Sequence, residues 1–290
     1  MLSENVLRWS VSGREYRLDF ARPLIMGIIN VTPDSFSDGG LFYKPEAAIR
    51  QARQHISEGA DVLDIGGETT RPGSSATSEE EEWRRISPVL KEVCSWRDCP
   101  PVSVDTNKRA VAEKALDWGA SIINDIWAGR KEPEILALAA KRGAPVILMH
   151  MLGEPRTMQV EPYYDDVVAE VRSFLLERAQ AAMAAGIPKE MIILDPGMGF
   201  GKNAVHNLTL LNHFEEVVPG GFRSLMALSR KAFLGRITGE ADPLKRDPAT
   251  AAANAIAVAK GAQMIRVHNV AASRDAALVA FAARRQELMS

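Results

Sequence analysis

The stretch "EGADVLDIGGETTRPG" (58–73) contains one full copy of the pattern that decides the fold. The Gly-Ala pair at 59–60 ends a helical segment. A short apolar run follows at 61–66, and a loop of polar and glycine residues comes after it. The same joint recurs in "WGAS" (118–121), "RGAP" (142–145) and "KGAQ" (260–263). Glycine suits the left-handed residue just past a helix end. Four copies of one helix-to-strand joint favour one repeated unit over two separate domains.

Eight apolar runs of strand length recur along the chain: "LIMGIIN" (24–30), "DVLDIG" (61–66), "PVSVDT" (101–106), "SIINDI" (121–126), "PVILMH" (145–150), "MIILDP" (191–196), "SLMALS" (224–229) and "MIRVHN" (264–269). They are apolar at consecutive positions, which indicates parallel strands buried on both faces. Helices are expected between them, at 45–58, 79–94, 108–118, 133–142, 165–185, 205–216, 248–260 and 272–287. This order predicts an α/β protein, a single closed (β/α)₈ TIM barrel over residues 24–287.

The segment before the first strand, "VLRWSVSGREYRLDF", alternates around Ser12-Gly13 and predicts an N-terminal β-hairpin at 7–20. We expect this hairpin to lie across the bottom of the barrel, away from the chemistry. The chain contains no low-complexity linker, so we predict a single domain over residues 1–290.

Composition and charge exclude several classes of function. Of the 290 residues 46% are hydrophobic and 25% charged, and the net charge of −2 gives no basic surface for nucleic acid or an anionic membrane. The sequence contains no run of 18 apolar residues and no apolar core of a secretory signal. Cys94 and Cys99 have no Cys or His neighbours at metal-binding spacing, so a reducing cytoplasm is the expected location.

Polar residues follow all eight predicted strands. In a TIM barrel the active site is built at the C-terminal ends of the strands. A single Asp or Asn there would be an ordinary turn residue. Polar residues at the ends of all eight strands, however, would come together at one open end of the barrel, its mouth. In chain order these residues are Asn30, Asp64, Asp105, Asn124 with Asp125, His150, Asp195, Ser229 with Lys231, and Arg266 with His268.

Three loops at the predicted mouth are unusual. The polar loop "NVTPDSFSDGG" (30–40) is longer than a turn requires, and such loops usually serve a function. In the loop after the second strand, Arg71 beside a Pro-Gly turn suggests an anion ligand, whereas "EEEE" (79–82) is expected to be a solvated first helical turn. "DPGMGFGK" (195–202) lacks the Walker spacing, and its alternate glycines would let Phe200 approach a flat ligand.

Taken together, these motifs resemble the dihydropteroate synthase family over essentially the whole chain. The segments that carry the resemblance are "GIINVTPDSFSDGG", "DIGGETTRPG", "SVDT", "IIND", "LMHMLGEPRTMQ", "LDPGMGFGKN", "SRKAFLG" and "IRVH". The family joins 6-hydroxymethyl-7,8-dihydropterin diphosphate to p-aminobenzoate, giving 7,8-dihydropteroate and diphosphate. The resemblance therefore implies a transferase of folate biosynthesis.

The resemblance also implies roles for individual residues. Asp105, Asn124 and Asp195 would bind the pterin donors, Lys231 the ring acceptors, and Met149, Phe200 and the Arg266 guanidinium would pack on the ring. Arg71, Arg266 and His268, with Thr70, would bind the diphosphate. Asn30 and Asp38 would form a Mg²⁺ site. The complete catalytic set is Arg71, Asp105, Asp195, Lys231, Arg266 and His268, and the further substrate-binding residues are Thr70, Asn124, Met149, Phe200, Phe36, Pro72 and Ser229.

In the family, the loops after the first two strands build the p-aminobenzoate pocket once diphosphate is present. Phe36 and Pro72 would wall this pocket, and sulfonamides would compete there, so the resemblance implies a sulfonamide-sensitive enzyme. Thr69, Asn269 and Ala232 depart from common family residues. Of these, Ala232 replaces a serine that can help to hold the benzoate carboxylate, which leaves that carboxylate more dependent on backbone N–H groups.

Only small-molecule substrates are expected as ligands, with no nucleic acid or membrane partner. A homodimer through the later helices is expected, since family members pair that way and "ATAAANAIAVAK" (249–260) is unusually small and apolar for an outer helix. Two other functions would fit the same barrel less well. A pterin-binding methyltransferase would have no use for Arg71, and a non-catalytic paralogue should have lost members of the diphosphate set.

Overall fold

The computed structural model describes residues 5–32, 45–69 and 76–287. Eight parallel strands close into a barrel in the order β10-β3-β4-β5-β6-β7-β8-β9. They are β3 (Leu24–Asn30), β4 (Val62–Gly66), β5 (Val102–Asp105), β6 (Ile122–Asp125), β7 (Val146–Met149), β8 (Ile192–Asp195), β9 (Arg223–Met226) and β10 (Met264–Val267). The predicted (β/α)₈ barrel is confirmed.

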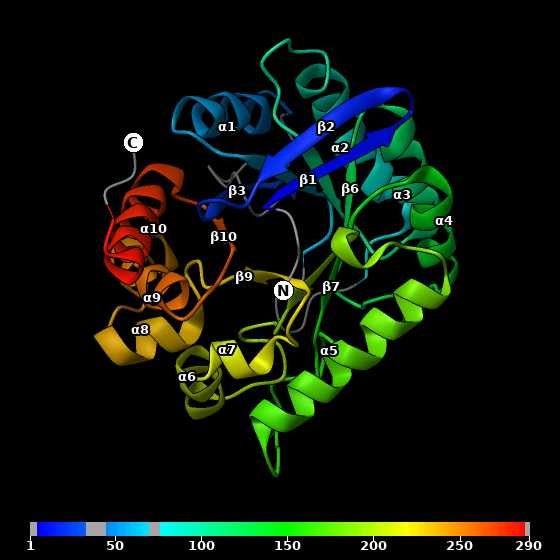
Figure 1. The fold of residues 1–290 in the computed structure, drawn as a ribbon. Helices are drawn as coiled ribbons and strands as arrows, with labels where there is room; N and C mark the ends of the chain where they lie inside the picture. Colours follow the sequence, from blue (N-terminus) through cyan, green and yellow to red (C-terminus); the bar gives the residue numbers. More distant parts are fainter. Residues whose placement is uncertain (1–4, 33–44, 70–75, 288–290) are drawn as a thin grey trace.

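The strands are buried on both faces, as their consecutive apolar residues predict. Every residue of β4, β6, β7, β8 and β9 is buried, and in β3 only Asn30, at the mouth, is not. The inward face fills the barrel, and the outward face packs under a ring of helices (Figure 1).

The helices of this ring are α1 (Pro45–Ser57), α2 (Glu79–Val93), α3 (Arg109–Asp117), α4 (Glu134–Arg142), α5 (Val167–Ala184), α6 (Ala204–Asn212), α7 (Phe214–Val217), α8 (Ala232–Thr238), α9 (Asp247–Ala259) and α10 (Val270–Arg285), with the 3-10 turns η2 (Lys189–Met191) and η3 (Pro243–Lys245). The glycines of the four Gly-Ala joints all have left-handed backbone angles, with φ from 63° to 107°. This confirms the helix ends that the joints predict.

Two helical features differ from the prediction. The single helix expected at 205–216 is divided into α6 and α7, because His213 leaves helical geometry at φ −108° and ψ 26°. The break lets Phe214 and Val217 become buried. The short helix α8 was not predicted, because its seven residues are too few to establish a periodic pattern.

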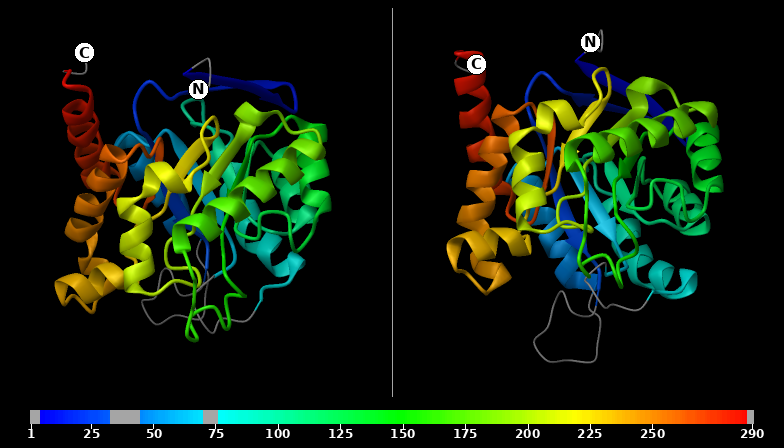
Figure 2. Two further views of the ribbon diagram at one scale, coloured as in Figure 1. Left: turned by 60° about the horizontal axis from the view of Figure 1, so that its bottom comes forward. Right: turned by 90° about the horizontal axis from the view of Figure 1, so that it is seen from below.

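The N-terminal hairpin pairs β1 (Val6–Val11) with β2 (Arg14–Asp19), and Ser12 and Gly13 form the turn with positive φ. The buried Trp9 donates from Nε1 to the Ser121 carbonyl at 3.0 Å, and the Tyr16 hydroxyl donates to the Gly119 carbonyl at 3.3 Å. Both carbonyls precede β6, so the hairpin lies against the N-terminal ends of the strands, at one end of the barrel (Figure 2). The predicted position is confirmed, and the mouth lies at the opposite end.

Within residues 5–32, 45–69 and 76–287, no helix combines the length and the hydropathy that crossing a bilayer would require.

Candidate active site

A cavity of about 860 Å³ opens at the C-terminal ends of the strands. All ten predicted site residues that the structure describes line it: Asn30, Asp105, Asn124, Met149, Asp195, Phe200, Ser229, Lys231, Arg266 and His268. Residues from seven different strand ends thus reach one space, as a barrel mouth requires. The predicted Phe36, Asp38, Thr70, Arg71 and Pro72 lie outside the described residues.

The Arg266 guanidinium bridges two carboxylates across the mouth. Its Nε donates to Asp64 Oδ2 at 2.6 Å, and its Nη2 donates to Asp105 Oδ2 at 2.7 Å. Asn124 Nδ2 adds a third bond, 3.2 Å to Asp64 Oδ2. Asp64 was predicted only as a strand-end residue, yet its fully buried carboxylate helps to hold Arg266 in place. Two of the guanidinium's nitrogens are therefore committed to protein carboxylates.

This cluster places two carboxylates beside one guanidinium. Burial raises the pKa of Asp105 to about 7; the Arg266 cation opposes this rise, while the Asp64 charge adds to it. One guanidinium therefore serves two carboxylates, and only Nε and Nη2 are used in these contacts. Such a site favours a ligand that brings N–H donors.

Asp195 and Lys231 provide opposite charges at neighbouring strand ends. Asp195 is buried at the end of β8, and its Oδ1 accepts from the Gly197 N–H at 2.7 Å. Burial raises the pKa of Asp195, and this backbone donor partly opposes the rise. Burial also lowers the pKa of Lys231 to about 8, against the attraction of Asp195. The Lys231 ammonium lies 4.4 Å from the centre of the Phe200 ring, in a cation–π contact.

An apolar cluster forms one wall of the cavity. It consists of Ile126, Met149, Met151, Met158 and Phe200, with Trp127 packed against it. Met149 and Phe200 lie where a flat ring would pack. Met158 also lines the cavity but was missed, because it comes from the long connection after β7 rather than from a strand end.

Ser229 holds His268 in one orientation. The Ser229 hydroxyl and His268 Nδ1 are 2.8 Å apart, and the His268 backbone N–H donates to the same hydroxyl oxygen at 3.0 Å. When the hydroxyl donates to Nδ1, the ring proton lies on Nε2. Burial lowers the pKa of His268 to about 3, so the imidazole is neutral near pH 7. His268 is therefore not a cation, and in the tautomer with the ring proton on Nε2 it is a hydrogen-bond donor to the cavity.

The prediction that every strand-end group points into the mouth was wrong for Asp125 and His150. Asp125 accepts from the backbone N–H groups of Trp127 at 2.8 Å and Gly129 at 2.6 Å, as a turn residue does. His150 packs edge-on against Phe174, at 4.8 Å between ring centres. Neither lines the cavity. Successive strand residues point to opposite faces, so Asn124 and Met149 take the inward positions.

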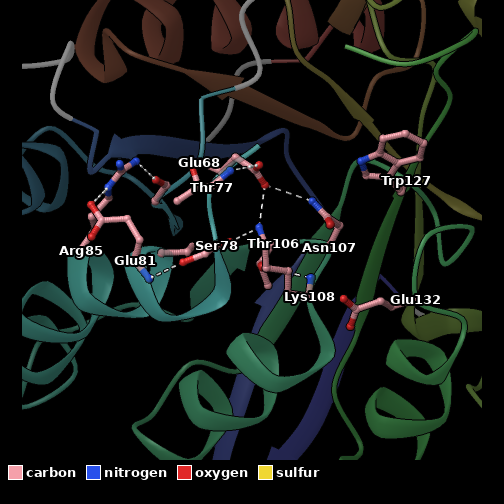
Figure 3. A network of polar contacts seen from close by, with 12 residues as sticks. Glu68, Thr77, Ser78, Glu81, Arg85, Thr106, Asn107, Lys108, Trp127 and Glu132 are labelled. Carbon is pink, nitrogen blue, oxygen red and sulfur yellow. Dashed lines mark hydrogen bonds and ion pairs between the residues drawn. The ribbon is translucent and has the colours of Figure 1, made fainter. Parts of the chain in front are cut away.

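Glu68 links the cavity to the neighbouring helices. Its carboxylate accepts from Thr77 N at 2.9 Å, Asn107 Nδ2 at 3.3 Å and Lys108 Nζ at 2.8 Å (Figure 3). The same ammonium pairs with Glu82, which is fully buried. The expectation that all four glutamates of "EEEE" are solvated was wrong for Glu82. Its position on the inward face of α2, four residues before buried Ile86, explains this.

The comparisons with known proteins agree with this geometry. The family model described as "Pterin binding enzyme" matches residues 26–268. The dihydropteroate synthase of Neisseria meningitidis serogroup C is 46% identical over 271 residues, which cover 92% of this chain and 94% of the relative.

Two solved structures are also similar. The Yersinia pestis dihydropteroate synthase in complex with a sulfonamide drug has a TM-score of 0.88 and 42% identity, and the match covers 96% of this chain and 100% of that one. The Xanthomonas albilineans dihydropteroate synthase in complex with 7,8-dihydropteroate has a TM-score of 0.85 and 44% identity, and the match covers 96% of this chain and 99% of that one. This chain forms a barrel with these groups at its mouth, and it matches these proteins along nearly its whole length. It belongs to the dihydropteroate synthase family.

Proposed function

We propose that this chain condenses 6-hydroxymethyl-7,8-dihydropterin diphosphate with p-aminobenzoate, forming 7,8-dihydropteroate and diphosphate for folate biosynthesis. The observation that carries the proposal is that the buried Asp195 carboxylate, the partly buried Asp105 carboxylate and the Lys231 ammonium line one cavity beside an apolar wall. This arrangement, in a chain of this family, suits a flat, polar heterocycle.

The pterin is proposed to bind at the floor of the mouth. Its exocyclic amine and ring N–H groups are donors, and Asp105, Asn124 and Asp195 provide acceptor oxygens. Lys231 donates to the ring acceptors, and the ring packs against Met149 and Phe200. A buried polar group without a partner is costly, so these side chains discriminate against ligands that lack the matching donors.

The diphosphate is proposed to lie farther out in the mouth. His268 presents its Nε2 proton there, and Arg266 contributes positive charge through a guanidinium whose orientation two carboxylates fix. Thr70 and Arg71, outside the described residues, are proposed as further ligands. Positive charge and N–H donors at this place stabilise the negative charge that develops on the leaving group.

Magnesium is the proposed cofactor. In the described part of the chain no cluster of three or more His, Cys, Asp or Glu residues could hold a metal alone. Asn30 lines the cavity at the end of β3, and one amide oxygen together with water and phosphate oxygens is a ligand set that Mg²⁺ accepts. Asn30, with Asp38 from outside the described residues, would hold the ion, which when bound neutralises diphosphate charge.

The reaction then needs no protein nucleophile. The bond between the pterin methylene and the diphosphate oxygen breaks, and both electrons leave with the diphosphate. The electron-rich pterin stabilises the cationic methylene. The lone pair of the aniline nitrogen forms the new C–N bond, and that nitrogen loses a proton. The side chains of the mouth contribute position and electrostatic stabilisation.

A homodimer formed through the later helices is also proposed. Large apolar side chains are exposed on α8, η3, α9 and α10, namely Ile237 at 56%, Leu244 at 69%, Ile256 at 48% and Val279 at 71%. A second copy of the chain would remove some of this surface from water. Sedimentation should give twice the 31.7 kDa of one chain. A mass of one chain at micromolar concentration would contradict the proposal.

The cytoplasm is the proposed location. Cys94 and Cys99 are free thiols, which suit a reducing compartment.

The proposed activity is tested by measuring diphosphate release from the purified protein. Release should require the pterin diphosphate, p-aminobenzoate and Mg²⁺ together, stop on chelation of the metal, and return when Mg²⁺ is added in excess. Release that is independent of p-aminobenzoate would indicate hydrolysis, and no release under any of these conditions would exclude the synthase activity.

Asp195→Asn should weaken pterin binding by about 2–4 kcal/mol, because a buried charge-assisted hydrogen-bond pair is broken. Calorimetry with 6-hydroxymethyl-7,8-dihydropterin measures this loss. Asp125→Asn is the matched control, since Asp125 is also a buried strand-end aspartate but caps a turn outside the cavity. It should lower stability and leave pterin affinity unchanged. Equal affinities in the two variants would remove Asp195 from the pterin site.

A further inference from the structure

Lys202, the last residue of "DPGMGFGK", is a buried lysine to which the proposed reaction gives no role. It is 2% exposed and borders the cavity. Its Nζ lies 2.8 Å from His150 Nδ1, 3.0 Å from the Gly197 carbonyl oxygen and 3.0 Å from the Phe200 carbonyl oxygen. An ammonium has three N–H donors, and these three acceptors use all of them. Lys202 therefore has no donor left for a substrate.

These three hydrogen bonds persist in either protonation state. An ammonium donates to both carbonyls and to His150 Nδ1, with the ring proton on Nε2. A neutral amine donates to both carbonyls, and its lone pair accepts a hydrogen bond from the Nδ1–H group when the ring proton is on Nδ1. Burial lowers the pKa of Lys202 well below its ordinary value, against the nearby Asp195 carboxylate, and burial lowers that of His150 to about 2. The contacts are thus insensitive to pH in the neutral range.

The turn that Lys202 holds, residues 197–201, has little stiffness of its own. Gly197, Gly199 and Gly201 all have positive φ, of 66°, 80° and 64°. Such a glycine-rich turn has many accessible backbone conformations. It also presses closely on β7, since a Cβ at Gly197 would lie 1.8 Å from the His150 carbonyl oxygen. Side-chain hydrogen bonds therefore help to select its conformation, together with this close packing.

Lys202 joins both halves of this turn to the end of β7. One carbonyl comes from Gly197, whose N–H donates to Asp195 Oδ1, and the other comes from Phe200, whose ring borders the cavity. Asn207 holds the turn from α6, accepting from Gly199 N at 2.7 Å. A shift of Gly197 would turn the Asp195 carboxylate, and a shift of Phe200 would open the apolar wall.

We propose that Lys202 is a positioning residue for the pterin: by tying the 197–201 turn to His150, it fixes the Asp195 carboxylate and the Phe200 ring in the arrangement that a flat bicyclic ring requires. The inference rests on the proposed pterin-binding roles of Asp195 and Phe200. It predicts that the side chain influences binding without touching the ligand.

Lys202→Met tests this directly, because methionine fills nearly the same space without hydrogen bonds. Affinity for 6-hydroxymethyl-7,8-dihydropterin, measured by calorimetry, should fall by about tenfold or more. Hydrogen exchange of the 197–201 amides should become faster while the fold is retained. Lys141→Met, at an exposed position in the last turn of α4, removes the same charge and should leave affinity within about twofold.

His150→Phe is the second variant. It keeps the ring packing against Phe174 and Tyr164 but removes the acceptor at Nδ1, while both carbonyl contacts remain. The loss of affinity should be smaller, about threefold, and the double variant should bind no worse than Lys202→Met alone because the two side chains act as a unit. If Lys202→Met does not fold, the pterin affinity of His150→Phe tests the inference, and an unchanged affinity in that variant would overturn it.

Three results would overturn or redirect the inference. If folded Lys202→Met binds the pterin as well as the unchanged protein does, while Asp195→Asn binds it more weakly, the role of Lys202 is overturned and the proposed pterin site stands. Weaker binding without faster exchange at 197–201 would contradict positioning through the turn. Unchanged affinity in both Lys202→Met and Asp195→Asn would show that the proposed pterin site itself is wrong.

Discussion

The Arg266 guanidinium, held between the Asp64 and Asp105 carboxylates, is the contact on which the mouth of the barrel depends. It connects the last strand, β10, to β4 and β5 and spans the position where the barrel closes on β3. Removing one member of a largely buried ion cluster leaves a charge without compensation, so these three side chains are constrained together. They also orient the surrounding polar groups, since Asn124 donates to the same Asp64 oxygen that Arg266 contacts.

The charges that remain at the mouth suit the proposed chemistry. The Asp64 and Asp105 carboxylates share one guanidinium, and Lys231 lies near Asp195. The cavity therefore has carboxylate oxygens as acceptors and the Lys231 ammonium as a donor. His268 adds a neutral N–H donor that Ser229 orients. For a reaction that proceeds by loss of a charged leaving group, such preorganised groups avoid the cost of reorienting water. The hairpin packs at the opposite end of the barrel, against the N-terminal ends of the strands.

The sequence predicted the barrel well because its signals are local. Gly-Ala joints and consecutive apolar runs each involve only a few neighbouring residues. Other features have no local signal. Whether Asn124 or Asp125 faces inward depends on the pleat of β6, and the contact between Arg266 and Asp64 joins residues 202 positions apart. The burial of Glu82 depends on its ion pair with Lys108, from a different helix–strand unit.

The most direct test of this account is a carbon-13 NMR titration of the Asp105 carboxyl group. Burial in the charge cluster raises the pKa of Asp105 to about 7, and Arg266 limits that rise. The account predicts a midpoint near this value in the unchanged protein and a higher midpoint in Arg266→Met, where the opposing cation is lost. A midpoint near the ordinary aspartate value of about 3.9 would contradict the account, because it would show a carboxylate in contact with bulk water rather than one held in the charge cluster.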